Sequence, residues 1–284
     1  IQSGRRGRGP HRWGVFFCMG GTGKLVDELG ALMQRHGIHI QLAADVDEIV
    51  LESKRATGVR LNSGETLNAD IVVFGGDPET CYKHLLPAKK TFSLPIIKKQ
   101  YSMGLYVLYF GTRKLYPDVA HHSIWMGPRF QELLSEIFDS KQMSEDFSLY
   151  VHRPTATDKS FAPDGCESFY VLCPVPNLLG DVNWETEGPV LRDRIVTALE
   201  ETILPELSSV IEEVFWMTPE DFAKDYRSMH GAGFSIEPRL TQSAWFRFHN
   251  RDRAISNLYF VGAGTHPGAG LPGVVSSAKV VEEL

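Results

Sequence analysis

Residues 257–270 read NLYFVGAGTHPGAG, and residues 271–279 continue as LPGVVSSAK. The apolar run that opens this stretch has the length of a β-strand, and four of the nine residues 262–270 are glycine. Pro272 suits the first turn of a helix, whose partial positive end would then point into the loop. Because glycine has no Cβ atom, backbone N–H groups there can approach a flat or anionic ligand closely. The stretch therefore predicts a strand, a loop and a helix that together hold a large cofactor.

This stretch resembles the C-terminal flavin-binding motif of the bacterial-type phytoene desaturases, a family of FAD-dependent carotenoid desaturases. The resemblance covers residues 13–284, because further segments match the family in the same order along the chain. These segments are WGVFF (13–17), GGTG (20–23), YSMGLYVLYF (101–110), EDFSLY (145–150), FSIEP (234–238), TQSAWFR (241–247) and HNR (249–251). Two positions depart from the family pattern, since Cys18 and Phe248 stand where proline is usual. Both lie outside the glycine-rich loop.

The family also has a feature that this sequence lacks. Its members begin with a strand–turn–helix unit that carries the fingerprint G-x-G-x-x-G and binds the FAD pyrophosphate. No such unit stands near residue 1, and the only literal match, at 268–273, does not directly follow its strand. Too few residues follow that match for the acidic residue expected about 20 positions on. We therefore expect the chain to be the C-terminal part of a longer enzyme, without the N-terminal Rossmann unit.

The resemblance implies an α/β fold with α+β character, namely the FAD/NAD(P)-binding fold of flavin oxidoreductases with a mixed-sheet substrate domain. Hydrophobic spacing indicates helices at 23–37, 130–138 and 189–204, and a helix start at 218–221. Apolar or alternating runs indicate strands at 38–43, 46–51, 57–61, 70–74, 101–111 and 169–175. The last two runs are apolar on both faces, as central strands are.

We expect four segments along the chain. The start, rich in glycine and arginine, has no apolar periodicity and reads as a disordered or artefactual end. The expected boundaries are 1–12 for this end, 13–79 for part of the FAD-binding domain, 80–240 for the substrate-binding domain, and 241–284 for the C-terminal part of the FAD-binding domain.

Composition excludes several classes of protein. A net charge of -6 and a pI near 5.9 argue against nucleic-acid binding, which favours a basic face. The four cysteines form no C-x-x-C pair, which fits a reducing cytoplasm better than a disulfide framework. Ten histidines include the adjacent His121 and His122 but no metal-ligand spacing such as H-E-x-x-H, so no metal is expected. No apolar run approaches the length of about 20 residues that spans a bilayer.

The resemblance implies FAD-dependent desaturation of phytoene, or of a C30 analogue, by hydride transfer to flavin N5 with loss of a proton. It implies that the backbone of Val46 meets the adenine. His266 sits in the glycine-rich loop, where it either contacts the flavin region, takes a proton as a catalytic residue, or orders the loop. The remaining expected cofactor-binding residues are Gly262, Ala263, Gly264, Thr265, Gly268, Gly270, Leu271, Pro272, Gly273 and Val274.

The expected substrate is an apolar polyene that arrives from a bilayer, so we expect a cytoplasmic enzyme that associates peripherally with the membrane surface. Its oligomeric state is left open. Two alternatives are another flavin reaction on an isoprenoid, such as isomerisation, ketolation or saturation, and a prenyl-lipid carrier without catalysis. The intact glycine-rich loop argues against the carrier. The 284 residues alone are not expected to be active.

Overall fold

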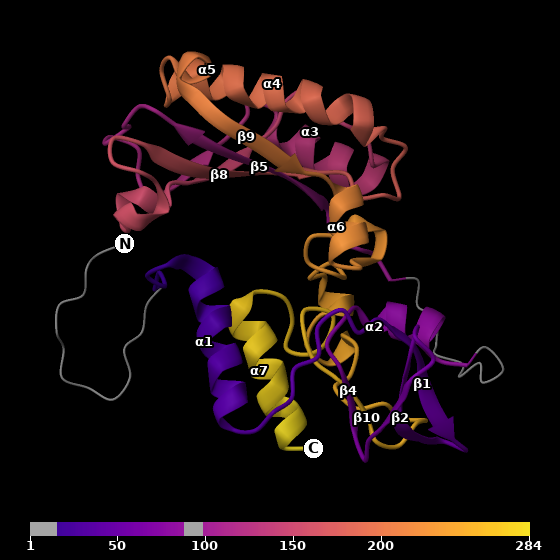
Figure 1. Ribbon diagram of the computed structural model, residues 1–284. Coiled ribbons are helices and arrows are strands. Elements are labelled where there is room, and N and C mark those ends of the chain that lie inside the picture. The colour runs from indigo at the N-terminus through magenta and orange to yellow at the C-terminus, as the bar shows by residue number, and fades with distance from the viewer. Residues whose placement is uncertain (1–15, 88–98) are drawn as a thin grey trace, which may run out of the picture.

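The computed structural model describes residues 16–87 and 99–284, so the expected end at 1–12 lies outside the described residues. Figure 1 shows a sheet with helices on one face, above a second part that carries α1, α7 and smaller sheets. The strands are β1 (Val46–Glu52), β2 (Arg55–Leu61), β3 (Thr66–Asn68), β4 (Val72–Phe74), β5 (Gly104–Thr112), β6 (His122–Trp125), β7 (Leu149–His152), β8 (Glu167–Val175), β9 (Ile211–Met217) and β10 (Leu258–Phe260). The helices are α1 (Gly21–Arg35), α2 (Pro78–Thr80), α3 (Phe130–Ser135), α4 (Trp184–Thr202), α5 (Leu207–Val210), α6 (Pro219–Asp225) and α7 (Leu271–Glu282).

The larger sheet has the strand order β6-β7-β8-β5-β9, and all of its neighbouring strands are antiparallel. The expectation of a mixed sheet is therefore wrong for the residues that the structure describes. The helical connection through α4 and α5 joins β8 to β9, which run in the same direction, as such crossovers usually do. Because β5 lies between these two strands and runs against both, no parallel pair results.

One face of this sheet forms the main hydrophobic core. Alternate residues of β8, including Phe169 and Val171, point into it and are buried. From α4, Leu191, Ile195 and Leu199 cover the same face at the spacing of one helical stripe. Burial of each such side chain stabilises the fold by roughly 1.5–3 kcal/mol. This predicted helix begins earlier than residue 189, because the side chain of Asn183 accepts hydrogen bonds from the first free N–H groups of α4.

The second part is built from segments far apart in the chain. β10 pairs in parallel with β4, with Leu258 opposite Val72, and β1, β2 and β3 form an antiparallel sheet beside them. Ile49, Val72, Leu258 and Phe260 share one core. The predicted pair of strands at 46–51 and 57–61 is confirmed as β1 and β2. The predicted strand at 70–74 is shorter than expected, and Val73 of β4 is half exposed.

Two apolar stretches of this second part are uncovered. The predicted strand at 38–43 is absent, and Ile38, Ile40 and Leu42 are exposed. Among the described residues no strand pairs with this run, and a strand is not stable without a partner. The predicted helix at 23–37 is confirmed as α1. Its apolar side chains, such as Leu29 and Leu32, are nevertheless largely exposed.

Candidate cofactor site

The glycine loop (residues 262–273) follows β10 and includes the first residues of α7, and its glycines allow contacts that other residues would block. Gly262 has a φ of 106°, and a Cβ atom there would lie 3.1 Å from the oxygen of Gly75. A Cβ atom on Gly273 would lie only 2.6 Å from the oxygen of Gly268. The loop therefore folds back on the start of α7 with backbone packed against backbone.

Buried polar side chains hold this loop in place. The Thr265 side chain is fully buried, and its hydroxyl donates to the oxygen of Gly262 at 3.0 Å. Asn250 donates from Nδ2 to the oxygens of His266 at 2.9 Å and Phe260 at 3.1 Å. Arg247 donates from Nε to the oxygen of Ala263 at 3.0 Å. The loop is thus pre-formed by hydrogen bonds from the neighbouring segment 247–250.

The N-terminus of α7 is open. No side chain caps the helix, and residues 269–272 are exposed. Its free N–H groups and the partial positive charge of the helix end, about half an elementary charge, favour an anionic or electron-rich ligand group. Ser277 anchors the helix from behind, because its buried Oγ accepts a hydrogen bond from the N–H of Gly262 at 2.8 Å. The arrangement fixes the position of the helix end relative to β10.

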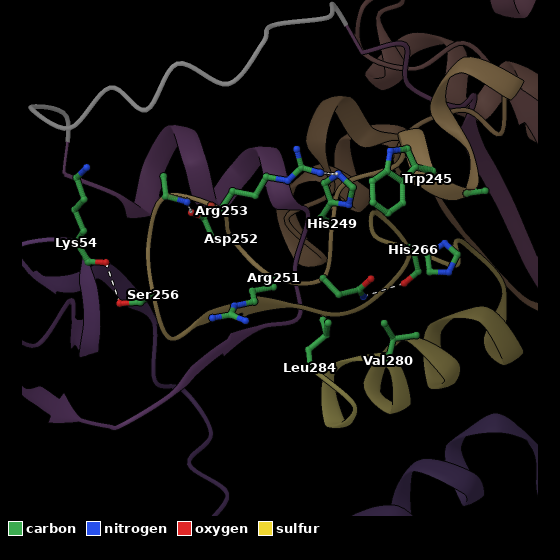
Figure 2. Close-up of a pocket in the computed structure, with 13 residues that line it drawn as sticks. Lys54, Trp245, His249, Arg251, Asp252, Arg253, Ser256, His266, Val280 and Leu284 are labelled. Carbon is green, nitrogen blue, oxygen red and sulfur yellow. Dashed lines mark hydrogen bonds between the residues drawn. The ribbon is translucent and has the colours of Figure 1, made fainter.

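A cavity of about 840 Å³ lies beside the loop (Figure 2). Its walls come from residues 249–254, from His266, and from Val280 and Leu284 at the end of α7. This volume is in the range that binds cofactors and drug-sized ligands. The Nδ1 atom of His266 is buried, and no hydrogen-bond partner for it lies among the described residues. A ligand or water molecule is the natural partner for such an atom.

Asp77 joins the second part to the segments that lead into the large sheet. Its Oδ2 accepts a hydrogen bond from the Ser235 hydroxyl at 2.7 Å, and its Oδ1 accepts one from the N–H of Glu79 at 3.0 Å. The Tyr101 hydroxyl lies 3.4 Å from the same Oδ1. Burial raises the pKa of Asp77, although these hydrogen bonds oppose the rise. We did not expect a role for Asp77 from the sequence, even though Asp-Pro after a strand is a common helix start.

The face of the large sheet opposite α4 carries aromatic rings. Tyr170 of β8 points to this face and makes edge contacts with Tyr109 and Tyr150, at centroid distances of 5.4 and 6.0 Å. Phe215 of β9 stacks on Tyr109 at 4.7 Å and is 59% exposed. In Figure 1 this face is turned toward the part that carries α1 and α7. It offers flat, weakly polar surfaces that suit an extended apolar molecule.

Known proteins resemble this chain over almost its whole length. A lycopene-forming phytoene desaturase of Paracoccus is 48% identical over 277 residues, which are 96% of this chain and 55% of that protein. A lycopene-forming phytoene desaturase of Pseudescherichia vulneris is likewise 48% identical, over 96% of this chain and 56% of its own length. A neurosporene-forming phytoene desaturase of Rhodobacter capsulatus is 42% identical, over 96% of this chain and 54% of its own length.

The chain is a relative of the phytoene desaturases. It spans about half the length of these curated phytoene desaturases. No family model matches the chain. The fold agrees with solved oxidoreductases: one from Methanosarcina mazei has a TM-score of 0.61 at 17% identity, and covers 94% of this chain and 55% of its own. A putrescine oxidase variant has a TM-score of 0.52 at 11% identity, and the match covers 94% of this chain and 54% of that protein. The predicted flavin-oxidoreductase fold class is therefore confirmed.

The predicted cofactor-binding residues at 262–265, 268 and 270–274 lie in the glycine loop and the start of α7, and none of them lines the cavity. Of the predicted site residues, His266 lines it, whereas Val46 lies at the start of β1 and is not part of its wall. Gly264 packs against Pro78, since a Cβ atom there would lie 2.4 Å from the Pro78 Cδ. The sequence reasoning missed Asn250 and Arg247, whose roles depend on contacts with the loop. The domain boundaries and the site assignments stay predictions.

Proposed function

We propose that this chain is part of an FAD-dependent phytoene desaturase that introduces double bonds into a colourless C40 polyene or its C30 analogue. The observation that carries the proposal is the 48% identity with a lycopene-forming enzyme over 96% of the chain. That span includes the glycine loop, the segments that hold it, and the aromatic sheet face. The alternative of a carrier without catalysis is less well supported, because the loop and its hydrogen bonds are intact.

The residues present fit FAD as the cofactor. The open N-terminus of α7 would hold an electron-rich edge of the isoalloxazine, and the glycines would let backbone N–H groups approach it. The residues that would hold the group are Gly262, Ala263, Gly264, Thr265, Gly268, Gly270, Leu271, Pro272, Gly273 and Val274, with Val46 as a contact of the adenine. When bound, FAD supplies the hydride acceptor for desaturation.

The protein's own contribution is to orient the polyene, exclude water and handle a proton. The aromatic face around Tyr109, Tyr170 and Phe215 would bind the apolar chain by burial of its surface. A dry, oriented substrate reacts faster because the reacting atoms are held in place. His266 is the proposed proton acceptor, because it lines the cavity and its buried Nδ1 has no partner among the described residues.

The function is tested by expressing the full coding sequence in a host that accumulates phytoene. We expect a structured visible absorption band in the extract, and its position reports the number of double bonds formed. A colourless extract from cells that contain the folded yellow flavoprotein would overturn the desaturase. His266→Gln should lower pigment yield while bound FAD is retained, whereas wild-type pigment yield in this variant would remove His266 from the mechanism.

We also propose that the enzyme meets the membrane through residues 240–246. No helix in the described part of the chain is long and apolar enough to cross a membrane. Leu240, Trp245 and Phe246 are 90%, 70% and 61% exposed. Lys99 donates from Nζ to the oxygen of Phe246 at 3.1 Å, and Arg253 lies 6.0 Å from the Trp245 ring centroid. Exposed Trp and Phe beside cations are typical of surfaces that bind anionic lipid.

A further inference from the structure

Three histidines meet at one corner of the large sheet: the consecutive His121 and His122, and His152 from the neighbouring strand. His122 begins β6 and lies directly opposite His152 of β7, and His121 precedes β6. One ligand atom from each residue lies within 4.8 Å of those of the other two. The ring centroids are 4.3 Å apart for His121 and His122, and 4.8 Å apart for His121 and His152. The sheet register, rather than a sequence motif, creates this cluster.

The outer nitrogens of two rings are already engaged. His121 contacts the Thr157 hydroxyl through Nδ1, and His122 lies 2.7 Å from the Tyr150 hydroxyl through Nδ1. In metal sites, a histidine ligand usually has its second ring nitrogen held by a hydrogen bond, which fixes the tautomer and the ring orientation. With Nδ1 engaged, Nε2 is the ring nitrogen through which His121 and His122 can bind a metal, and the Nε2 of His121 already faces that of His152.

The spacing of the inner nitrogens is close to that of a metal site. The Nε2 atoms of His121 and His152 are 2.8 Å apart, which is a hydrogen-bond distance, so one of the two rings carries a proton there. Two nitrogens bound to one tetrahedral Zn²⁺ at 2.0–2.1 Å lie about 3.3 Å apart. A shift of about 0.5 Å would give this pair the zinc spacing, and the His122 nitrogen, within 4.8 Å of the other two, would complete the site by approaching to the same spacing.

The three rings pack against one another and against a further aromatic side chain. His152 is partly buried and stacks on His121 and His122 at centroid distances of 4.8 and 5.1 Å. The ring of Phe17 packs edge-on against His121 at 4.6 Å and gives the cluster an apolar wall. Three imidazoles without a carboxylate suit Zn²⁺, Ni²⁺ or Cu²⁺, whereas Mg²⁺ and Ca²⁺ prefer oxygen ligands.

We propose that His121, His122 and His152 bind a divalent transition-metal ion, with water in the fourth position. The sequence analysis predicts no metal site, because the spacing of histidines along the chain matches no ligand motif. That spacing cannot reveal His152, which reaches His121 and His122 only through strand pairing. The site clamps the edge strand β6 to β7 and to the turn that carries Thr157. It is separate from the glycine loop and does not depend on the proposed desaturase activity.

The test measures Zn²⁺ binding to the protein expressed from its full coding sequence, without a polyhistidine tag and after treatment with EDTA. We expect one equivalent of Zn²⁺ by calorimetry and by metal analysis after gel filtration. His152→Ala should weaken binding by at least about 10-fold, and Tyr150→Phe should weaken it by about 10-fold through loss of the bond to His122. His84→Ala, at an exposed position outside the cluster, is the matched control and should bind normally.

Two outcomes would overturn the site: no binding of Zn²⁺ at micromolar concentration by the wild-type protein, or equal binding by the wild-type protein and His152→Ala. If His152→Ala does not fold, Co²⁺ in the wild-type protein replaces it as the test. Four-coordinate Co²⁺ bound by nitrogen gives intense visible absorption, which supports the proposal. The weak spectrum of six-coordinate Co²⁺ would contradict it.

Discussion

The side-chain amide of Asn250 donates to the main-chain oxygen of His266 across 2.9 Å and thereby fixes the middle of the glycine loop. The same amide nitrogen also donates to the oxygen of Phe260, at the end of β10. A single buried side chain therefore sets the distance between the strand and the loop that follows it. This bond is a sharper test of the loop than the glycines, because its removal changes no backbone dihedral preference.

Asn250→Ala should destabilise the protein and release FAD. Each carbonyl left buried without a partner costs about 1–3 kcal/mol. The effect is measured as the free energy of unfolding in urea and as flavin retained per protein after gel filtration. Asn68→Ala, at an exposed position of β3, is the control and should behave as the wild type. Equal flavin content in both variants would show that the bond does not shape the binding site.

Two glycines in helices should respond oppositely to alanine. Gly273 lies in the first turn of α7, and a Cβ atom there would meet the oxygen of Gly268 at 2.6 Å, so Gly273→Ala should displace the loop and lower FAD retention. Gly30 lies inside α1 with nothing within 4 Å of the added atom, so Gly30→Ala should stabilise the helix by about 0.5–1 kcal/mol. Thermal unfolding and bound flavin are measured for both variants. Unchanged stability and flavin content in Gly273→Ala would contradict the close packing of Gly273 against Gly268.

Asp77→Asn should gain stability relative to the wild type as the pH rises. Burial raises the pKa of Asp77 in the folded state, whereas the unfolded value is near 3.9. The stabilising contribution of the protonated carboxyl is fully present below the unfolded pKa and is lost as the pH rises through the folded pKa. Because asparagine does not ionise, the difference between variant and wild type should grow from about pH 4 to pH 7.

Urea unfolding at the two pH values measures this difference. Asp118→Asn, at an exposed position, is the control for the loss of one negative charge. A difference that does not change with pH would mean that the hydrogen bonds from Ser235 and Glu79 fully compensate for the burial of the Asp77 carboxylate.

The double variant Leu240→Ser and Phe246→Ser should bind lipid less tightly than the wild type. Both side chains are largely exposed, and loss of their apolar area removes the driving force for insertion into the interface. Co-flotation with vesicles that contain anionic lipid measures the bound fraction. Leu179→Ser, which changes an exposed leucine elsewhere on the surface, should leave binding unchanged. Unchanged flotation of the double variant would exclude this segment as the docking surface.

The sequence predicted best the features that local patterns control. The stripe of Leu191, Ile195 and Leu199 identified α4, and the glycine spacing identified the loop before α7, because helix periodicity and Cβ clashes act over a few residues. The capping pair of Thr218 and Asp221 likewise placed the start of α6 correctly. These signals need no knowledge of the rest of the fold.

Features that depend on partners distant in the chain were out of reach. The alternating run at 38–43 reads as a strand, but strand formation depends on a neighbour that supplies hydrogen bonds. Strand order likewise depends on which pairs form, so the insertion of β5 between β8 and β9 was not predictable from hydrophobicity. The meeting of His122 with His152 follows from that register in the same way. Pairing of Asp77 with Ser235 is a further contact of this kind.

The pairing of β4 with β10 has a consequence for the order in which the protein folds. The large sheet is continuous in the chain from Gly104 to Met217, so it can collapse while synthesis is still under way. The parallel contact of Val72 with Leu258 must instead close around that whole sheet, and such distant contacts form late because of their entropic cost. The glycine loop is therefore completed only after the whole large sheet has been synthesised, and a chain stopped before α7 would carry that sheet without the predicted cofactor loop.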